Sequence, residues 1–280
     1  MSPGDLPFTS TVEFYADYRP AYPDSVFAHV ADFFALDADD RVLDLGCGPG
    51  TVTLPLAEYA GHVVGMDPDE TMLAAARARS DAGGPADTAG SPDTRGSVEW
   101  VVGSDADLRT DDRLVDRLRP LRLTTMGRSF HWMEQGPTLE RLRDITEPGG
   151  GVALLNDTGW LTRGTADWQD AVYAVLDDYL DDPPERTGPV KYDDPWHELL
   201  ADHGFVETGE DRFPVERDWT AEAVVGYLLS LSFCSPAILG DRQADFEHNV
   251  RQALAEFDRE TFREIGDVRV TRGRVPRTDE

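Results

Sequence analysis

The most constraining feature of the sequence is a glycine-rich stretch behind a short apolar run, Val42-Leu43-Asp44-Leu45-Gly46-Cys47-Gly48-Pro49-Gly50-Thr51. Its three glycines stand at alternate positions, and a helix pattern begins directly after them. A backbone without side chains at Gly46, Gly48 and Gly50 can lie flat against a bound nucleoside-type cofactor. The stretch therefore predicts a strand, a cofactor-binding turn and a helix, in that order.

The apolar periodicity of the first half alternates between strand and helix patterns. Strand patterns occupy residues 41–45, 62–66, 98–102, 121–126 and 152–156, and helix patterns occupy residues 22–36, 51–60, 69–79 and 137–146. Strands that alternate with helices at this interval indicate a doubly wound α/β fold, with a parallel sheet covered by helices on both faces. Pro55 falls inside one helix pattern, so we expect it near the first turn of that helix.

The second half of the chain changes rhythm. Helix patterns cover residues 166–180, 196–203, 221–231 and 241–257, and strand patterns cover residues 205–213 and 268–275. We expect one domain over residues 1–280, with a cofactor-binding core at 12–156 and with substrate-side helices and the last two strands at 157–280. Residues 80–96 are small, polar and rich in glycine and proline, which predicts a mobile surface insertion.

Length and composition are those of a globular protein that works away from membranes. The chain has 280 residues, of which 40% are hydrophobic, enough for the core of one large domain. It contains no apolar run of about 18 residues, and its first residues lack the basic and apolar regions of a signal peptide. We therefore expect a cytoplasmic protein. Cys47 and Cys234 are too few for a disulfide framework, and we expect both to be buried core residues.

The charge of the chain is strongly acidic. Asp and Glu number 54 against 26 Lys and Arg, a formal net charge of −28, and Lys191 is the only lysine. The acids are spread along the whole chain, so the composition resembles the cytoplasmic proteins of extreme halophiles. In dilute buffer such self-repulsion opposes folding, whereas in molar salt a Debye length of about 3 Å screens it. The same charge disfavours nucleic acid as a partner, because binding phosphates needs a basic face.

The glycine spacing narrows the choice of cofactor. The dinucleotide fingerprint is G-x-G-x-x-G, but here the third glycine, Gly50, comes one residue early. This shifts the prediction from a nicotinamide dinucleotide towards a cofactor without a diphosphate. Asp67 ends the second strand pattern, 17 residues after Gly50, where a carboxylate can accept both ribose hydroxyls. Its alternative role is the N-cap of the following helix, and the two roles are compatible.

A second acidic turn follows the third strand pattern, in Gly103-Ser104-Asp105-Ala106-Asp107-Leu108. A carboxylate at this turn can accept a hydrogen bond from an adenine amino group, and the neighbouring backbone can read the ring nitrogens. The alternative is an ordinary surface loop in a chain that is rich in aspartate.

Taken together, these stretches resemble the class I S-adenosylmethionine-dependent methyltransferases. The matching residues are Asp44 to Gly50, Asp67, Ser104-Asp105-Ala106 and Glu147-Pro148-Gly149-Gly150-Gly151-Val152. The resemblance implies a Rossmann-like sheet of seven strands, mostly parallel, with an antiparallel last strand and helical insertions. It implies S-adenosyl-L-methionine as cofactor, with the glycines beneath methionine and ribose, Asp67 on the ribose, Asp105 on the adenine and Met72 packed near it. The implied cofactor set is Tyr18, Arg19, Asp44, Gly46, Cys47, Gly48, Gly50, Asp67, Pro68, Met72, Ser104, Asp105 and Ala106, with no metal site.

A finer resemblance links the chain to the small-molecule branch that includes trans-aconitate methyltransferase. It is carried by Tyr15-x-x-Tyr18-Arg19-Pro20-x-Tyr22-Pro23 and by Ser129-Phe130-His131-Trp132-Met133. It implies that Arg19 pairs with the methionine carboxylate, since a guanidinium suits a carboxylate, and that Tyr15 and Tyr18 wall the pocket. The alternative for Arg19 is a surface arginine that fixes a proline-rich turn. No arginine cluster lies in residues 157–240, so aconitate itself is not the expected substrate.

His131 is the candidate catalytic residue. It serves as a general base if the acceptor is a hydroxyl or an amine, and as an orienting donor or pocket wall if the acceptor is an ionised carboxylate. The prediction is a methyltransferase that transfers a methyl group to an oxygen, nitrogen or carbon atom of a small molecule, as a monomer or homodimer. The alternatives are a non-catalytic S-adenosylmethionine-binding subunit or sensor, an NAD-dependent dehydrogenase and, third, a nucleic-acid methyltransferase. Aromatic residues between 157 and 240 are expected to shape the substrate side.

Overall fold

The computed structural model describes residues 11–82, 96–157, 159–186 and 195–277. Most of the expected mobile insertion, residues 83–95, lies outside the described residues. The chain divides into two compact units. The sheet unit comprises Ala21–Asn156, Asp194–Phe213 and Val268–Glu280, and the helical unit comprises Met1–Pro20, Asp157–Asp193 and Pro214–Asp267. The expected cofactor core at 12–156 thus differs from the sheet unit, which starts at residue 21 and includes two later segments.

One seven-stranded sheet organises the fold, in the order β3-β2-β1-β4-β5-β7-β6. It is a mixed sheet whose last strand runs antiparallel to the others, so the predicted fold class is confirmed. The strands are β1 Arg41–Leu45, β2 His62–Asp67, β3 Ser97–Val102, β4 Leu121–Gly127, β5 Thr146–Asp157, β6 Val206–Trp219 and β7 Phe262–Arg274.

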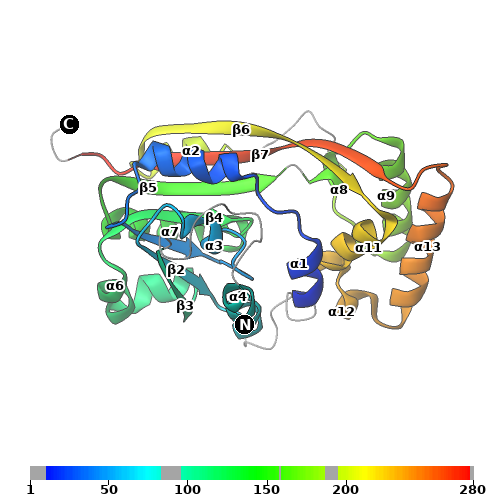
Figure 1. The fold of residues 1–280 in the computed structure, drawn as a ribbon, viewed down its shortest axis with the longest axis horizontal. Coiled ribbons are helices and arrows are strands. Elements are labelled where there is room, and N and C mark those ends of the chain that lie inside the picture. The colour runs from blue at the N-terminus through cyan, green and yellow to red at the C-terminus, as the bar shows by residue number, and fades with distance from the viewer. Residues whose placement is uncertain (1–10, 83–95, 158, 187–194, 278–280) are drawn as a thin grey trace. The chain divides into compact units, whose positions relative to one another are not determined.

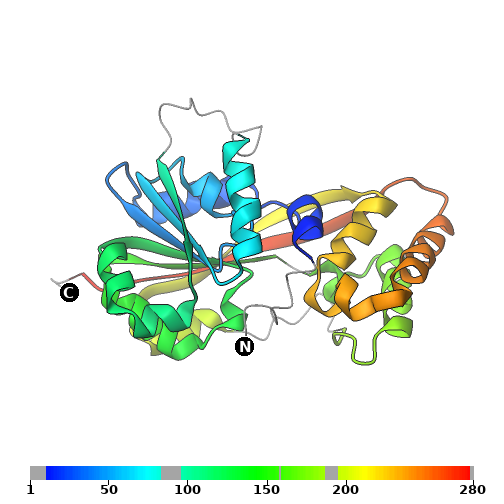
Figure 2. The same cartoon turned by 90° about the horizontal axis from the view of Figure 1, so that it is seen from below.

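Helices cover both faces of the sheet within the sheet unit. Figures 1 and 2 place α2 and α4 on one side of the sheet and α6 and α7 on the other. The helices of this unit are α2 Asp24–Phe34, α3 Thr53–Leu56, α4 Glu70–Asp81, α5 Asp105–Thr110, α6 Asp112–Leu118, η3 Phe130–Trp132, α7 Gln135–Ile145 and α10 Trp196–Asp202.

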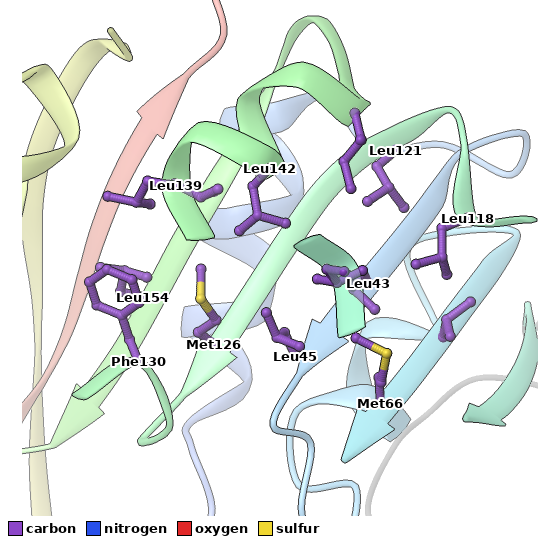
Figure 3. Close-up of a cluster of buried hydrophobic side chains, with 14 of the residues drawn as sticks. Leu43, Leu45, Met66, Leu118, Leu121, Met126, Phe130, Leu139, Leu142 and Leu154 are labelled. Atoms are coloured by element: carbon purple, nitrogen blue, oxygen red, sulfur yellow. The ribbon is translucent and has the colours of Figure 1, made fainter. Parts of the chain in front are cut away.

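The largest core of the sheet unit lies between the sheet and the helices α5, α6, α7 and α10. Leucine and methionine side chains of four parallel strands meet apolar side chains of these helices there. Figure 3 shows this packing for Leu43, Leu45, Met66, Leu118, Leu121, Met126, Phe130, Leu139, Leu142 and Leu154. Each fully buried side chain of this size stabilises the fold by about 1.5–3 kcal/mol. The packing of this core therefore helps to hold the parallel strands in their places in the sheet.

The helical unit has a separate core. In α9, Trp168, Val172 and Leu176 recur at every fourth residue and are buried, as expected of one helix face. They belong to one cluster with Phe246 and Val250 of α13. The elements of this unit are α1 Val12–Tyr18, α8 Trp160–Arg163, α9 Asp167–Tyr179, α11 Ala221–Leu229, η4 Ser232–Cys234, α12 Pro236–Leu239, η5 Gly240–Arg242 and α13 Gln243–Ala255.

No single helix among the described residues is long and apolar enough to cross a bilayer. The consecutive segments Ala221–Leu229 and Ser232–Ala255 meet the length and composition criteria only as a pair, bent by 102°.

The structure corrects several predicted boundaries. The helix expected at 51–60 shortens to Thr53–Leu56, with Pro55 inside its first turn as predicted. The strand expected at 152–156 begins at Thr146, and its pairing with β4 has a register shift between Leu121 and Leu123, so residues 146–151 also belong to the strand. The helices α1, α5 and α6 were not predicted; α5 and α6 are short and lie in a polar, aspartate-rich segment with little apolar periodicity.

Candidate functional site

The ends of four parallel strands meet at one edge of the sheet. In the ladders, Leu45 lies beside Met66, Asp67 beside Val102, and Asp44 beside Thr125. This register brings the segments that follow β1, β2, β3 and β4 to the same edge, the usual location of ligand sites in open α/β sheets. The predicted glycine loop, Asp67, the Ser104–Ala106 turn and His131 all lie at or just beyond these strand ends.

The glycine loop is tied to the end of β2. The amides of Gly46 and Cys47 both donate to the carbonyl oxygen of Met66, at 2.8 and 3.0 Å. Gly46, Gly48 and Gly50 have φ values of +70°, +52° and +79°, a region that residues with a side chain rarely adopt. The alternate glycines thus produce the tight turn between β1 and α3.

The three glycines face different surroundings. A Cβ atom on Gly46 would lie 2.6 Å from Cβ of Ser129, and one on Gly50 would lie 2.7 Å from Cη2 of Trp100. A Cβ atom on Gly48 would have nothing within 4 Å. Gly46 and Gly50 are therefore small because protein side chains press on them, whereas Gly48 alone faces open space. Sequence reasoning missed Trp100 and named Ser129 only as part of the motif after the fourth strand, since nothing in their spacing connects them to the loop.

Gly46, which has a side chain close to it, and Gly48, which faces open space, should respond differently to substitution by alanine. Gly46→Ala must strain the turn and displace Ser129, so we expect it to destabilise the protein by about 2–4 kcal/mol. Gly48→Ala introduces backbone strain but no steric clash, so we expect it to destabilise the protein by about 1–2 kcal/mol. Urea unfolding at constant salt measures both. Equal destabilisation by the two substitutions would contradict the distinction.

Asp67 lies directly beneath the loop, at 8% exposure. Its Oδ2 accepts from the amide of Gly48 at 2.8 Å, and its Oδ1 accepts from the amide of Asp69 at 2.9 Å. Burial raises the pKa of Asp67 to about 6, against the lowering effect of these two amides. Each oxygen has a lone pair left to accept a further hydrogen bond, such as one from a hydroxyl. The N-cap role that was the alternative for Asp67 belongs to Asp69, which accepts from the amide of Thr71.

Asp44 supports the loop from inside the protein. Its carboxylate is fully buried and accepts from the hydroxyl of Thr53 at 2.6 Å and from that of Thr125 at 3.0 Å. Burial raises the pKa of Asp44 to about 6, and the nearby Asp67 carboxylate adds to this effect. Asp44 therefore links the start of α3 to β4 through hydrogen bonds, and each of its carboxylate oxygens accepts a hydrogen bond from a protein hydroxyl.

The remaining residues of the predicted cofactor set at β1 and β2 are placed as follows. Cys47 and Met72 are both 4% exposed, and Pro68 is exposed at the end of β2. Burial raises the pKa of the Cys47 thiol well above its ordinary value, so the thiol stays protonated. Met72 lies in the first turn of α4, directly after the Asp67–Asp69 turn.

The acidic turn after β3 is ordered by its own side chains. The amide and hydroxyl of Ser104 both donate to Asp107, which caps α5, and Ala106 is exposed. The carboxylate of Asp105 is directed towards the start of α7: its Oδ2 accepts from the amide of Glu134 and from the hydroxyl of Thr138, both at 3.2 Å. The sequence signal that singled out Asp105 said nothing of α7.

His131 lies on η3, the short turn after β4, and is exposed, as is its neighbour Trp132, which has an exposed fraction of 56%. The two ring centroids are 5.3 Å apart. Ser129, which precedes η3, is buried and donates to the carbonyl oxygen of Leu45 at 2.8 Å. The predicted catalytic histidine thus stands at the same sheet edge as the glycine loop, on a turn that touches the loop through Ser129.

Tyr15, Tyr18 and Arg19 of the N-terminal motif belong to the helical unit, whereas Tyr22 and Pro23 belong to the sheet unit. The guanidinium carbon of Arg19 lies 4.9 Å from the ring centroid of Tyr15 and 5.3 Å from that of Tyr227. One Arg19 nitrogen donates to the carbonyl oxygen of Ser230 at 3.3 Å. The ring of Tyr18 packs on Gly226 of α11, where a Cβ atom would lie 2.3 Å from it.

Comparison with known proteins shows that the strand-end segments lie within a stretch that matches a methyltransferase domain. Residues 42–150 match the family model described as a methyltransferase domain, a stretch that contains the glycine loop, Asp67, Asp105 and His131. The chain is 25% identical over 228 residues to an uncharacterised methyltransferase-like protein of Schizosaccharomyces pombe, covering 81% of this chain and 77% of that protein. It is 29% identical over 158 residues to an uncharacterised methyltransferase of Mycobacterium tuberculosis, covering 56% and 53%.

A solved structure from Anaeromyxobacter dehalogenans, provisionally assigned as a type II methyltransferase, has the same fold. Its TM-score is 0.56 at 21% identity, over 93% of this chain and 99% of that one. With the matched domain and the relatives, the chain is an S-adenosylmethionine-dependent methyltransferase. This sets aside the dehydrogenase and the non-catalytic subunit that the sequence left open.

Proposed function

We propose that this methyltransferase transfers the methyl group of S-adenosylmethionine to a small organic molecule. The observation that carries the proposal is the pairing of Asp67 with the open side of the glycine loop. The Gly48 amide is held by the carboxylate of Asp67, and nothing lies within 4 Å of the position that a Cβ atom on Gly48 would occupy. A flat, hydroxyl-bearing group such as a ribose fits a carboxylate with a lone pair left on each oxygen beside an open glycine.

The buried acids beneath the loop suit a cationic cofactor. When bound, S-adenosylmethionine supplies an electrophilic methyl group on a positively charged sulfonium sulfur. Asp44, Asp67 and Asp69 are each no more than 8% exposed, and the carboxylates of Asp44 and Asp67 are ionised above pH about 6. Fixed negative charge in a poorly solvated site favours a cation far more than the same charge in water.

The remaining roles in the proposal follow the sequence. His131 contacts the acceptor, as a base for a hydroxyl or amine and as an orienting donor for a carboxylate, which is already ionised. Arg19 binds a ligand carboxylate: it is partly buried between two tyrosine rings, and among the described residues no carboxylate pairs with it. Methyl transfer then depends mainly on holding donor and acceptor in line and on excluding water.

Charge supports a small molecule as the acceptor. A chain with net charge −28 repels a polyphosphate backbone, and nucleic-acid enzymes gain most of their affinity from phosphate contacts. We therefore propose that the acceptor is neither DNA nor RNA, and that the protein acts in the cytoplasm as a monomer or homodimer.

A labelled-methyl assay tests the proposal. The protein is incubated in molar KCl with methyl-labelled S-adenosylmethionine and a small-molecule cell fraction, and in parallel with ribosomal RNA, transfer RNA and duplex DNA. We expect label in a small molecule and none in the nucleic acids, with the signal lost in Asp67→Ala. Mass spectrometry of the product identifies the methylated atom. Label in nucleic acid, or in no small molecule, would contradict the proposal.

A further inference from the structure

We propose that Asp105 is a positioning residue that sets the place of the His131–Trp132 turn. The turn is defined here as residues 129–134, which run from the end of β4 to the start of α7. The inference rests on the proposed function only in assigning acceptor contact to this turn. It differs from the adenine-binding role that the sequence implied for Asp105.

The contacts of the Asp105 carboxylate point to the turn. Its Oδ2 accepts from the amide of Glu134, the last residue of the turn, and from the hydroxyl of Thr138 in the first turn of α7, both at 3.2 Å. The side chain of Asp105 is only 16% exposed, so water competes weakly for these bonds. A hydrogen bond to an ionised acceptor is about twice as strong as a neutral one. Asp105 thus joins the segment after β3 to the end of the turn after β4.

Arg109 completes this connection. Its Nη2 lies 3.4 Å from Oδ2 of Asp105, and its Nη1 is hydrogen-bonded to the carboxylate of Glu134. One arginine therefore neutralises both acids that meet there. Without it, Asp105 and Glu134 would repel each other across the hydrogen bond that joins them.

The other end of the turn is held by the glycine loop. The hydroxyl of Ser129 donates to the carbonyl oxygen of Leu45, and the Ser129 side chain lies so close to Gly46 that a Cβ atom there would meet it at 2.6 Å. His131 and Trp132 lie between the two attachments, and the Trp132 ring is largely exposed. The two attachments therefore fix both ends of the segment that carries the two rings. Asp105, which follows β3, supplies the attachment at the end of the turn next to α7.

Local hydrogen exchange tests the proposal on the protein alone, without an acceptor. We compare amide exchange of residues 130–138 by mass spectrometry in wild type, Asp105→Ala, Asp105→Asn and Thr138→Val. We expect about tenfold faster exchange in Asp105→Ala, a smaller rise in Thr138→Val, and near-normal protection in Asp105→Asn, whose amide oxygen still accepts. Peptides of β1 and β2 report whether the fold is intact.

A matched control removes an acid that contacts α7 but not the turn. Asp112 is 91% exposed and pairs with Arg141 of α7 at 2.9 Å, so Asp112→Asn changes the same charge and should leave exchange at 130–138 unchanged. Unchanged exchange in both Asp105→Ala and Thr138→Val would overturn the proposal, even if Asp105→Ala unfolds more easily.

The separate effects of Asp105→Ala on kcat and on KM distinguish a positioning role of Asp105 from direct contact with the adenine. With whichever acceptor the labelled-methyl assay identifies, we expect Asp105→Ala to lower kcat about tenfold and to change KM for S-adenosylmethionine less than about threefold. A raised KM with unchanged kcat would overturn the positioning role in favour of adenine contact. Because the exchange measurement needs no acceptor, it stands whether or not the acceptor is a small molecule.

Discussion

Asp67→Ala should weaken binding of S-adenosylhomocysteine, the reaction product, by a factor of at least about 100, measured by isothermal titration calorimetry. The expectation follows from two losses: hydrogen bonds from two ribose hydroxyls to a charged acceptor, each worth about 1.5–3 kcal/mol, and the bond that holds the Gly48 amide in place. The loop loses its tether to this carboxylate, so the open face of Gly48 is less well preorganised. Asp67→Asn should fall in between, because its amide oxygen still accepts.

Glu70→Gln is the matched control for this substitution. Glu70 is exposed in the first turn of α4, three residues beyond Asp67, and carries the same charge. Its replacement should change the dissociation constant less than about threefold, since exposed charges are well screened. An effect of Asp67→Ala no larger than that of Glu70→Gln would exclude Asp67 from the cofactor site.

The pKa of Asp67 predicts a pH dependence of cofactor binding. Burial raises this pKa to about 6, so the carboxylate is ionised above that pH and protonated below it. The ionised form is the better acceptor, so the dissociation constant should be constant above pH about 7 and rise by at most about tenfold per unit below pH 6. Calorimetry between pH 5 and 8 measures this, and Asp67→Asn should flatten the curve. A rise that persists in Asp67→Asn would assign the titration to another group.

The melting temperature should rise by about 20 °C between dilute buffer and molar KCl. A net charge of −28 repels itself over a Debye length of about 10 Å at 0.1 M salt but only about 3 Å at 1 M. If screening of this repulsion raises the free energy of unfolding by several kcal/mol, the melting temperature of a chain of this size rises by roughly this amount. Differential scanning calorimetry measures the shift.

Sucrose is the control for the salt experiment, because it favours burial of surface without screening charge. At matched osmolality it should raise the melting temperature by much less than KCl. A melting temperature independent of KCl would remove the self-repulsion argument, and an equal effect of sucrose would assign the gain to solvent exclusion.

The parallel core was predictable because its signals are local. Each of β1 to β4 begins and ends within one residue of its apolar pattern, since a buried strand is a short continuous apolar run. The last two strands were predicted too short: β6 continues to Trp219 and β7 begins at Phe262. The additional residues of both strands, 214–219 and 262–267, lie in the helical unit. Apolar and charged residues are mixed in these two stretches, so neither contains the continuous apolar run that predicts a core strand.

By itself, the sequence determined the strand–loop–helix start and the methyltransferase class, and it predicted a ribose-binding role for Asp67, because glycines and acids at strand ends act through their own backbone and spacing. Only the tertiary structure showed that Ser129 presses on Gly46 and that Asp105 bonds to Glu134 and Thr138. These partners lie 83, 29 and 33 residues apart along the chain. Contacts of that kind depend on which strand ends the sheet order brings together, and no local pattern encodes them.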